Sequence, residues 1–419
     1  MAGISDVSRP LERVFRDEWG TVVATLARRL GDLQAAEDAA QEAFAAAAVA
    51  WPRDGLPPRP GAWLTVTAWR KALDQIRHDR LFAEREADLR RLYAAREDEG
   101  EVGLAVEDDR LRLIFACCHP ALAAQVRVAL TLRYLAGLTT REIAAAFLLP
   151  EATLAQRLVR AKHKIREAGI RFEVPGPDAL PGRLSDVRSV IYLVFNEGYA
   201  ASDSAQLIRV ELCDEAIWLG RLLHRLLPND AETAGLLALM LLHHARTPGR
   251  QDASGRPVPL AEQDRTTWHP DMIAEGVGVL DAALARRAPG PYQVQAAIAA
   301  LHAQAPSFER TDWPQIAVLY GELARRAPSP IVEVNRAVAV GMADGPRAGL
   351  AVLEPIIAAG DLDDYGPLHA AYADLLDRVG DPAASAAWQR TIDSLKNPAL
   401  RQELERRRAS RIREQESSG

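Results

Sequence analysis

Leu130–Ala168 reads LTLRYLAGLTTREIAAAFLLPEATLAQRLVRAKHKIREA, and this stretch decides the fold. The hydroxyl groups of Thr139 and Thr140 can cap a helix that begins near Arg141. Apolar residues then recur at helical spacing: Ile143, Ala144 and Phe147. Pro150 stops this pattern and opens a second helix. The apolar stripe of the second helix comprises Leu154, Leu158, Ala161 and Ile165. The stretch therefore predicts two short helices joined by a turn.

The opposite face of the second helix is basic. Residues 151–171 contain six basic and two acidic side chains, and 6 − 2 leaves a local charge of +4. Such a face suits a phosphate backbone, and in a helix-turn-helix the early residues of the second helix contact base edges. This assigns base contacts to Glu151, Ala152, Thr153, Gln156, Arg157 and Arg160, and phosphate contacts to Lys162 and Lys164. Thr140 and Arg141 are also assigned to DNA. The alternative is an ordinary helical hairpin with a solvated basic face.

The segment TTREIAAAFLLPEATLAQRLVRAKHKIR resembles the C-terminal DNA-binding domain of extracytoplasmic-function sigma factors, a group of the sigma-70 family. The resemblance implies that residues 108–173 form sigma region 4, which binds the minus-thirty-five promoter element. One departure concerns the turn. Many helix-turn-helix proteins have glycine there, whereas this sequence has Leu148 and Leu149.

The whole chain has 419 residues, which is enough for two to four domains. It is rich in Ala, Leu and Arg and has few runs of Val, Ile or Thr, so we expect an all-α protein. The net charge of −6 argues against a protein that coats nucleic acid indiscriminately. The sequence shows no N-terminal signal region, and its longest apolar run, Ala234–Leu242, is shorter than the ~20 residues that span a bilayer. We therefore expect a cytoplasmic protein that does not enter the membrane.

Residues 10–80 predict three helices, interrupted by the turn Pro52–Pro60. Ala36–Trp51 places Glu37, Asp38, Gln41 and Glu42 on a polar side, and by itself it fits a solvated acidic helix start. However, AEDAAQEAF is similar to the motif with which sigma factors grip the clamp helices of RNA polymerase. The resemblance implies sigma region 2, the polymerase core with its beta-prime and beta subunits as partner, and contacts by Asp38, Gln41, Glu42 and Phe44.

Gly61–Arg80 interleaves aromatic and basic residues, a mixture that suits single-stranded DNA because bases stack on aromatic rings and cations hold phosphates. The alternative for Trp63 is a core position. The stretch resembles the sigma helix that reads and melts the minus-ten promoter element, with Arg70, Lys71, Asp74 and Arg77 at matching polar places. In that interpretation a flipped base enters a pocket near Gly55–Pro60.

Residues 81–107 predict an acidic linker. Residues 81–109 contain four basic and ten acidic side chains, so 4 − 10 gives −6. The simplest interpretation is a flexible solvated linker, and the resemblance adds that such a segment could mimic nucleic acid in a polymerase channel.

After a Pro- and Gly-rich linker at 174–184, the sequence predicts a helical extension domain at 185–288. Leu184–Ala201 fits a helix with a buried face and contains IYLVFNEGYAAS, which resembles a signature of one sigma subgroup with a C-terminal extension. Asn196–Tyr199 favours a helix C-cap over a catalytic or ligand pocket that uses Glu197.

Residues 289–413 predict helical repeats. The segments that start at Val334 and Ala371 echo each other, and Ala337 and Ala373 differ by 36 positions (373 − 337), close to the ~34 residues of tetratricopeptide repeats. Such repeats offer a concave surface to a protein or peptide partner. Lys396–Arg413 predicts a charged capping helix.

Metal sites are not expected. Cys117, Cys118 and His119 are adjacent, so buried packing is favoured over zinc binding. For His243, His244, His269 and Asp271, core and loop positions are favoured over a metal site.

The sequence thus predicts an all-α sigma factor that recruits RNA polymerase core to promoter DNA and opens it, without cofactors or catalysis of its own. One alternative is a one-component helix-turn-helix regulator with a TPR-like sensor domain. The other is an enzyme in the C-terminal half that uses Glu197 with histidines.

Overall fold

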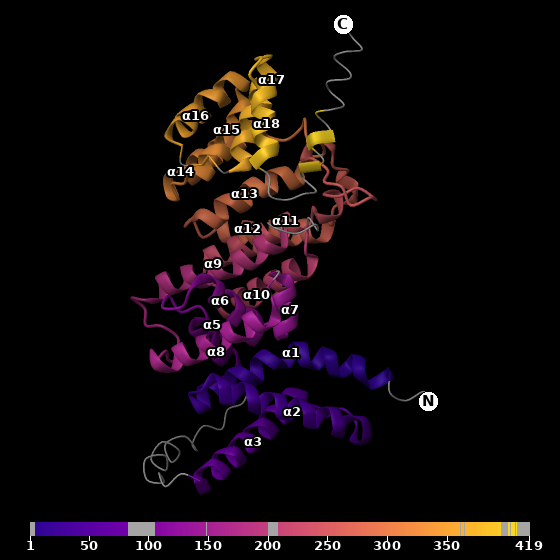
Figure 1. The fold of residues 1–419 in the computed structure, drawn as a ribbon, viewed down its shortest axis with the longest axis vertical. Helices are drawn as coiled ribbons and strands as arrows, with labels where there is room; N and C mark the ends of the chain where they lie inside the picture. Colours follow the sequence, from indigo (N-terminus) through magenta and orange to yellow (C-terminus); the bar gives the residue numbers. More distant parts are fainter. Residues whose placement is uncertain are drawn as a thin grey trace. The chain divides into compact units, whose positions relative to one another are not determined.

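Helices make up the regular structure of the described chain, apart from one isolated bridge between Gln251 and Pro257. The computed structural model describes residues 5–82, 105–147, 149–199, 208–360, 362, 363, 365–394, 401, 402, 404–406 and 408. The chain divides into two compact units, Met1–Leu193 and Val194–Gly419. Figure 1 colours the first unit from indigo to magenta and the second through orange to yellow. The all-α prediction is confirmed.

The first three helices are α1 (Ser5–Leu30), α2 (Leu33–Asp54) and α3 (Pro60–Phe82), as predicted. The Asp32 carboxylate caps α2 by accepting hydrogen bonds from the backbone N–H groups of Gln34 and Ala35. Gly55 ends α2 at φ +84°, and its N–H donates to the Trp51 carbonyl. The turn was expected to begin at Pro52, and this is wrong because Pro52 lies in the last turn of α2. Pro52 has no N–H group to donate to the Ala48 carbonyl, and Ala48 is exposed.

The next helices are α5 (Ala105–Cys117), α6 (Ala124–Tyr134), α7 (Thr140–Ala146) and α8 (Glu151–Glu167). Thr139 caps α7 through a reciprocal box with Glu142: the Glu142 N–H donates to Thr139 Oγ1 and the Thr139 N–H donates to Glu142 Oε2. In the turn, the Leu149 N–H donates to the Ala144 carbonyl, and Leu148 lies outside the described residues. The predicted apolar stripe of α8 is buried, as expected: Leu154, Leu158, Ala161 and Ile165. The predicted pair of helices is confirmed, whereas most of the acidic linker, 83–104, lies outside the described residues.

Helix α9 spans Leu180–Tyr199, so it begins within the stretch predicted as a linker. Its N-terminal half is fixed to the first unit by Asp186, which pairs with Arg127 at 3.0 Å. The predicted C-cap at Asn196–Tyr199 is wrong, because all four residues belong to α9. Gly198 is required for a different reason: a Cβ atom there would lie 2.8 Å from the backbone nitrogen of Cys213. The glycine thus permits a close approach to the start of α10.

The second unit contains α10 (Val210–Leu226), α11 (Ala231–His244), α12 (Pro270–Leu284), α13 (Pro291–Gln304), α14 (Trp313–Arg326), α15 (Pro330–Ala343), α16 (Pro346–Ala359), α17 (Gly366–Val379) and α18 (Ala384–Ser394). Residues 233–242 of α11 are all buried, and α10, α12 and α13 pack around this helix. Each helix from α12 to α17 has proline in its first turn, where the missing N–H costs nothing.

The two echoing segments form the pairs α15–α16 and α17–α18. Ala337 and Ala373 are fully buried, and Gly380 ends α17 in the left-handed conformation. A Cβ atom on Gly349 would lie 2.8 Å from the Ala337 carbonyl oxygen, so glycine allows α15 and α16 to pack closely. The pairing agrees with the repeat prediction, and the tetratricopeptide assignment stays a prediction. Most of the predicted capping helix, Lys396–Arg413, lies outside the described residues.

Candidate nucleic-acid interface

Helix α8 presents most of the predicted DNA-contacting residues to solvent. Glu151, Ala152, Gln156, Arg160 and Lys164 are exposed, and Thr153 and Arg157 are half-buried. Arg157 donates a hydrogen bond to the Gln125 side chain at 3.2 Å, which fixes it against α6. On α7, Arg141 is exposed and Thr140 is half-buried. One continuous face of the helix pair is therefore available to a ligand.

Helix α3 carries a second polar face. Arg70, Lys71, Asp74 and Arg77 are all exposed, and their spacing over two turns places them on one side of the helix. Trp63 is half-buried against Trp51, with ring centroids 5.4 Å apart, so it is held in place while part of its ring remains accessible. Lys71 also pairs with Glu42 at 3.7 Å, which connects this face to α2.

Helix α2 divides its predicted contact residues between surface and core. Asp38, Gln41 and Glu42 are exposed, and Gln41 and Glu42 lie three and four residues after Asp38, so they form one patch. Phe44 is only 7% exposed and packs against Phe15 and Trp19, with ring centroids 4.8 and 5.8 Å away. Phe44 therefore anchors α2 to α1 in this structure, and the exposed patch consists of the polar residues.

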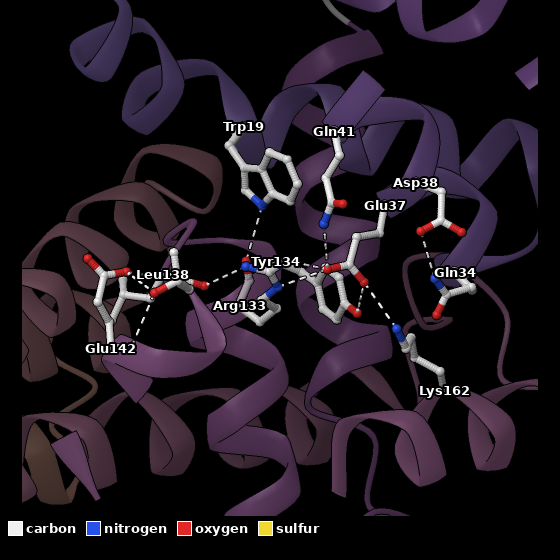
Figure 2. Close-up of polar contacts among 11 residues, drawn as sticks. Trp19, Gln34, Glu37, Asp38, Gln41, Arg133, Tyr134, Leu138, Glu142 and Lys162 are labelled. Carbon is white, nitrogen blue, oxygen red and sulfur yellow. Dashed lines mark hydrogen bonds and ion pairs between the residues drawn. The ribbon is translucent and has the colours of Figure 1, made fainter. Parts of the chain in front are cut away.

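Glu37 lies at the centre of a polar network that joins α2 to α6 and α8 (Figure 2). Its Oε1 accepts hydrogen bonds from the guanidinium of Arg133 at 2.6 and 2.9 Å. Its Oε2 accepts from the Tyr134 hydroxyl at 2.7 Å and from Lys162 Nζ at 3.1 Å. The Trp19 indole N–H donates to the Arg133 carbonyl at 3.1 Å. We call Glu37, Arg133, Tyr134 and Lys162 the Glu37 clasp.

The Glu37 clasp keeps a buried carboxylate ionised. Burial alone would raise the pKa of the Glu37 carboxyl, but the Tyr134 hydrogen bond and the charges of Arg133 and Lys162 outweigh burial and lower that pKa. Burial, followed by the Glu37 charge, raises the pKa of the Tyr134 hydroxyl, which therefore remains a donor. The side chains of Glu37, Arg133 and Lys162 are 7%, 12% and 14% exposed. The clasp is thus a nearly dry ion-pair network.

The clasp corrects one expectation and adds two residues. Glu37 was predicted on the solvated side of α2, but it is buried because it lies four residues after Leu33 and three before Ala40, both core positions. That spacing was the available signal. Arg133 and Tyr134 received no role from the sequence, because their partner is 96 or 97 positions away. Lys162, predicted to hold phosphate, is engaged by Glu37 in this structure.

The cysteines, Glu197 and His244, the other candidate site residues considered, are buried or paired with a nearby side chain. Cys117 and Cys118 are buried, and burial raises the pKa of the Cys118 thiol to about 11. Glu197 pairs with Arg209 at 2.9 Å, and His244 lies 3.1 Å from Asp214. Within the described ranges, no three His, Cys, Asp or Glu side chains are grouped to hold a metal ion. Nor does any described helix have the length and apolar character needed to cross a membrane.

Comparison with known proteins matches three segments of the chain. Residues 15–81 match Sigma-70 region 2, residues 112–165 match Sigma-70, region 4, and residues 183–284 match a family of unknown function, DUF6596. The uncharacterized protein R00370 of Rhizobium meliloti (strain 1021) is 44% identical over 379 residues, which cover 88% of each chain. No solved structure matches.

We predict that Glu37→Gln destabilises the first unit by about 3–5 kcal/mol at neutral pH, because it leaves two cations without their buried partner. A carboxyl with a lowered pKa in the folded state contributes stability above its ordinary pKa of 4.5 and loses it as the pH falls through the folded value. The difference between wild type and variant in urea unfolding should therefore shrink below about pH 4.5. Asp54→Asn, an exposed change on the same helix, is the control. A difference that is independent of pH would contradict the ionised clasp.

Proposed function

The chain belongs to the sigma-70 family, whose members recognise promoters and bind RNA polymerase, and we propose that it is an initiation factor of the extracytoplasmic-function type. The observation that carries the proposal is the order of sigma regions 2 and 4 along one chain, each with an exposed polar face on its own helix. The subgroup assignment rests on the resemblance of AEDAAQEAF and of the α7–α8 sequence.

Promoter reading is divided between α8 and α3. Helix α8 would enter the major groove of the minus-thirty-five element, with Glu151, Gln156 and Arg160 near base edges and Lys164 on phosphate. Helix α3 would bind the melted minus-ten element, where Arg70, Lys71 and Arg77 neutralise phosphates and Trp63 stacks on a base. The loop 55–59 would receive a flipped base.

The exposed patch on α2 is the polymerase contact. Asp38, Gln41 and Glu42 present two carboxylates and an amide on one face, which suits a basic and polar partner surface. Phe44 supports this patch from the core. Because the chain acts with polymerase core and promoter DNA, we place it in the cytoplasm and assign the chemistry of transcription to the polymerase.

The Glu37 clasp makes promoter binding depend on a rearrangement. Lys162 cannot bind a DNA phosphate while its ammonium group is paired with Glu37. The polymerase patch begins at Asp38, the residue after Glu37, so polymerase binding to α2 can shift the clasp directly. The structure then corresponds to a resting form, and polymerase favours a form in which Lys162 is free.

We propose that the second unit regulates these events through a protein or peptide that binds the helical pairs α15–α16 and α17–α18.

 This role is supported by the size of the unit and by its covalent attachment to the sigma regions.

The competing function is a one-component regulator that binds an operator without polymerase. The two differ in their need for polymerase core, which run-off transcription from a library of genomic fragments measures directly. Core-dependent starts at a shared two-part sequence support the sigma function, whereas DNA binding without any core-dependent start supports the regulator.

We predict that Arg160→Ala and Asp38→Arg separate the two activities. Arg160 is exposed on α8, and among the described residues its side chain donates only to the backbone of its own helix. Its removal should therefore weaken promoter recognition about 10-fold and leave core binding intact. Asp38→Arg reverses a charge in the α2 patch and should weaken core binding while promoter contacts by α8 remain. Fluorescence anisotropy with labelled core and run-off transcription measure the two effects. Equal loss of both activities in both variants would refute these roles.

A second prediction concerns the clasp. Glu37→Gln removes the charge that holds Lys162, so the variant should bind promoter DNA more tightly than wild type in the absence of polymerase, with a steeper dependence on salt because one more cation contacts phosphate. Electrophoretic mobility shifts at several salt concentrations test this. Asp54→Asn should behave like wild type. Weaker or unchanged DNA binding by a folded Glu37→Gln protein would reject the clasp as a restraint on Lys162.

The regulatory role predicts that removing the second unit changes transcription. A chain that ends at Leu193 is the informative truncation, because it keeps Arg183 and Asp186, which bond to Phe115 and Arg127 in the first unit. We expect its run-off transcription to differ from that of the full chain in strength or in promoter choice. If a folded truncated protein matches the full chain in both, the second unit does not regulate initiation.

A further inference from the structure

The second unit contains a cluster of basic and aromatic side chains near the ends of α11 and α13. Its members, which we call the basic cluster, are His243, Arg246, Arg250, Arg265, Trp268 and His302. Trp268 is buried and the others are half-buried. The guanidinium carbons of Arg246 and Arg265 lie 5.3 and 4.9 Å from the Trp268 ring centroid. Two arginines of the cluster thus pack against one indole ring.

The charges of the basic cluster are not balanced. In the part of the chain that the structure describes, none of its three arginines forms an ion pair with a carboxylate. The nearby acids Glu197 and Asp214 contact Arg209 and His244 instead, and Glu309, which acts on Arg265, is exposed. Removing a charge from water is costly unless a partner compensates for the lost hydration. Among the described residues, Arg246 and Arg250 therefore have no carboxylate partner, and Arg265 has only the exposed Glu309 near it.

The two histidines do not add to this charge. Burial, reinforced by the charge of Arg246, lowers the pKa of His243 to about 3 and that of His302 to about 4. Both imidazoles are neutral at physiological pH, and each carries one N–H group that can donate a hydrogen bond.

Hydrogen-bonding atoms without partners gather in the same place. Among the described residues, Arg246 Nε, His243 Nδ1, His302 Nδ1 and Trp268 Nε1 are buried and have no hydrogen-bond partner. The arginine and tryptophan atoms are donors, and either imidazole nitrogen can be one. Buried polar atoms are satisfied in the great majority of cases. Four such atoms in one cluster indicate a missing acceptor.

Packing explains two of the arginines but not the third. Arg265 donates to the carbonyls of His302 and Ala305 at 2.6 Å each and so caps the end of α13. Arg250 stacks on Tyr199, 3.8 Å from the ring centroid, and donates to its carbonyl. Arg246 has only the face of Trp268, and its side chain makes no hydrogen bond within the described chain.

We propose that the basic cluster binds a small molecule through a phosphate or carboxylate group, with Arg246 as the principal ligand. An oxyanion supplies both missing elements, a negative charge and acceptors for several donors, and the planar guanidinium of arginine matches its geometry. The proposal concerns residues of Val194–Gly419 alone and does not depend on the proposed role in transcription.

The test titrates the full-length protein with inorganic phosphate and, separately, with citrate, followed by calorimetry and by the thermal unfolding midpoint. We expect saturable binding of at least one of them, and the tighter of the two identifies the preferred group. Arg246→Gln should weaken that binding about 10-fold or more, because it removes a charge-assisted hydrogen bond. Arg347→Gln, an exposed change at the start of α16, is the matched control and should bind as wild type does.

The stability of the unliganded variant gives a second readout. If Arg246 is an anion ligand, the Arg246→Gln protein without anion should be at least as stable as the wild type, because the substitution removes an unpaired charge. A structural arginine would instead make the variant less stable. The proposal is overturned if neither anion binds saturably, if Arg246→Gln binds as tightly as wild type, or if the variant is destabilised while wild type does not respond to either anion.

Discussion

The first unit depends on one buried carboxylate. Glu37 is surrounded by a guanidinium, an ammonium group and a phenol, and each of its oxygens accepts hydrogen bonds from two side-chain groups or more. An ionised carboxylate at 7% exposure is tolerated only when its partners are in place, so α2, α6 and α8 must meet in this arrangement for Glu37 to remain charged. The Arg28–Asp109 pair at 2.6 Å supports the same arrangement from α1 and α5. Sigma region 2 is therefore held against region 4 by polar contacts that have a defined geometry.

Such a contact is strong when complete and costly when broken in part, which gives it the properties of a switch. Lys162 pairs with Glu37 in the structure, and in the proposed function it cannot bind a DNA phosphate at the same time. On α2, the exposed polar patch begins at the residue next to Glu37, so a partner on that patch acts on the same turn of helix that carries the clasp. Coupling between the two binding events then needs no long pathway through the protein, because both involve one helix turn.

Local sequence signals located most of the helices and missed the contacts between them. The hydroxyl cap at Thr139 and the apolar stripe of α8 are local patterns, and both predictions are confirmed. The reciprocal contact from Glu142 was not predicted. The Glu37 clasp joins positions about one hundred residues apart, and a sequence pattern in α2 alone cannot name those partners. The C-cap predicted at Asn196–Tyr199 is wrong for a related reason. Glycine is common at helix ends, but here Gly198 is needed because α10 packs closely against it. This tertiary contact overrides the local preference of glycine for a helix end.

The two units treat buried charge in opposite ways. In the first unit two cations and a phenol share the Glu37 carboxylate, so the charges of the clasp compensate one another inside the protein. In the second unit Arg246 and Arg265 pack on the Trp268 ring and Arg250 packs on Tyr199, and none of the three forms an ion pair with a carboxylate among the described residues. Arg250 and Arg265 also donate hydrogen bonds to carbonyl oxygens. A charge removed from water needs a compensating partner, and this rule explains the Glu37 clasp of the first unit. By the same rule, we assign Arg246 of the second unit to an anion from outside the chain.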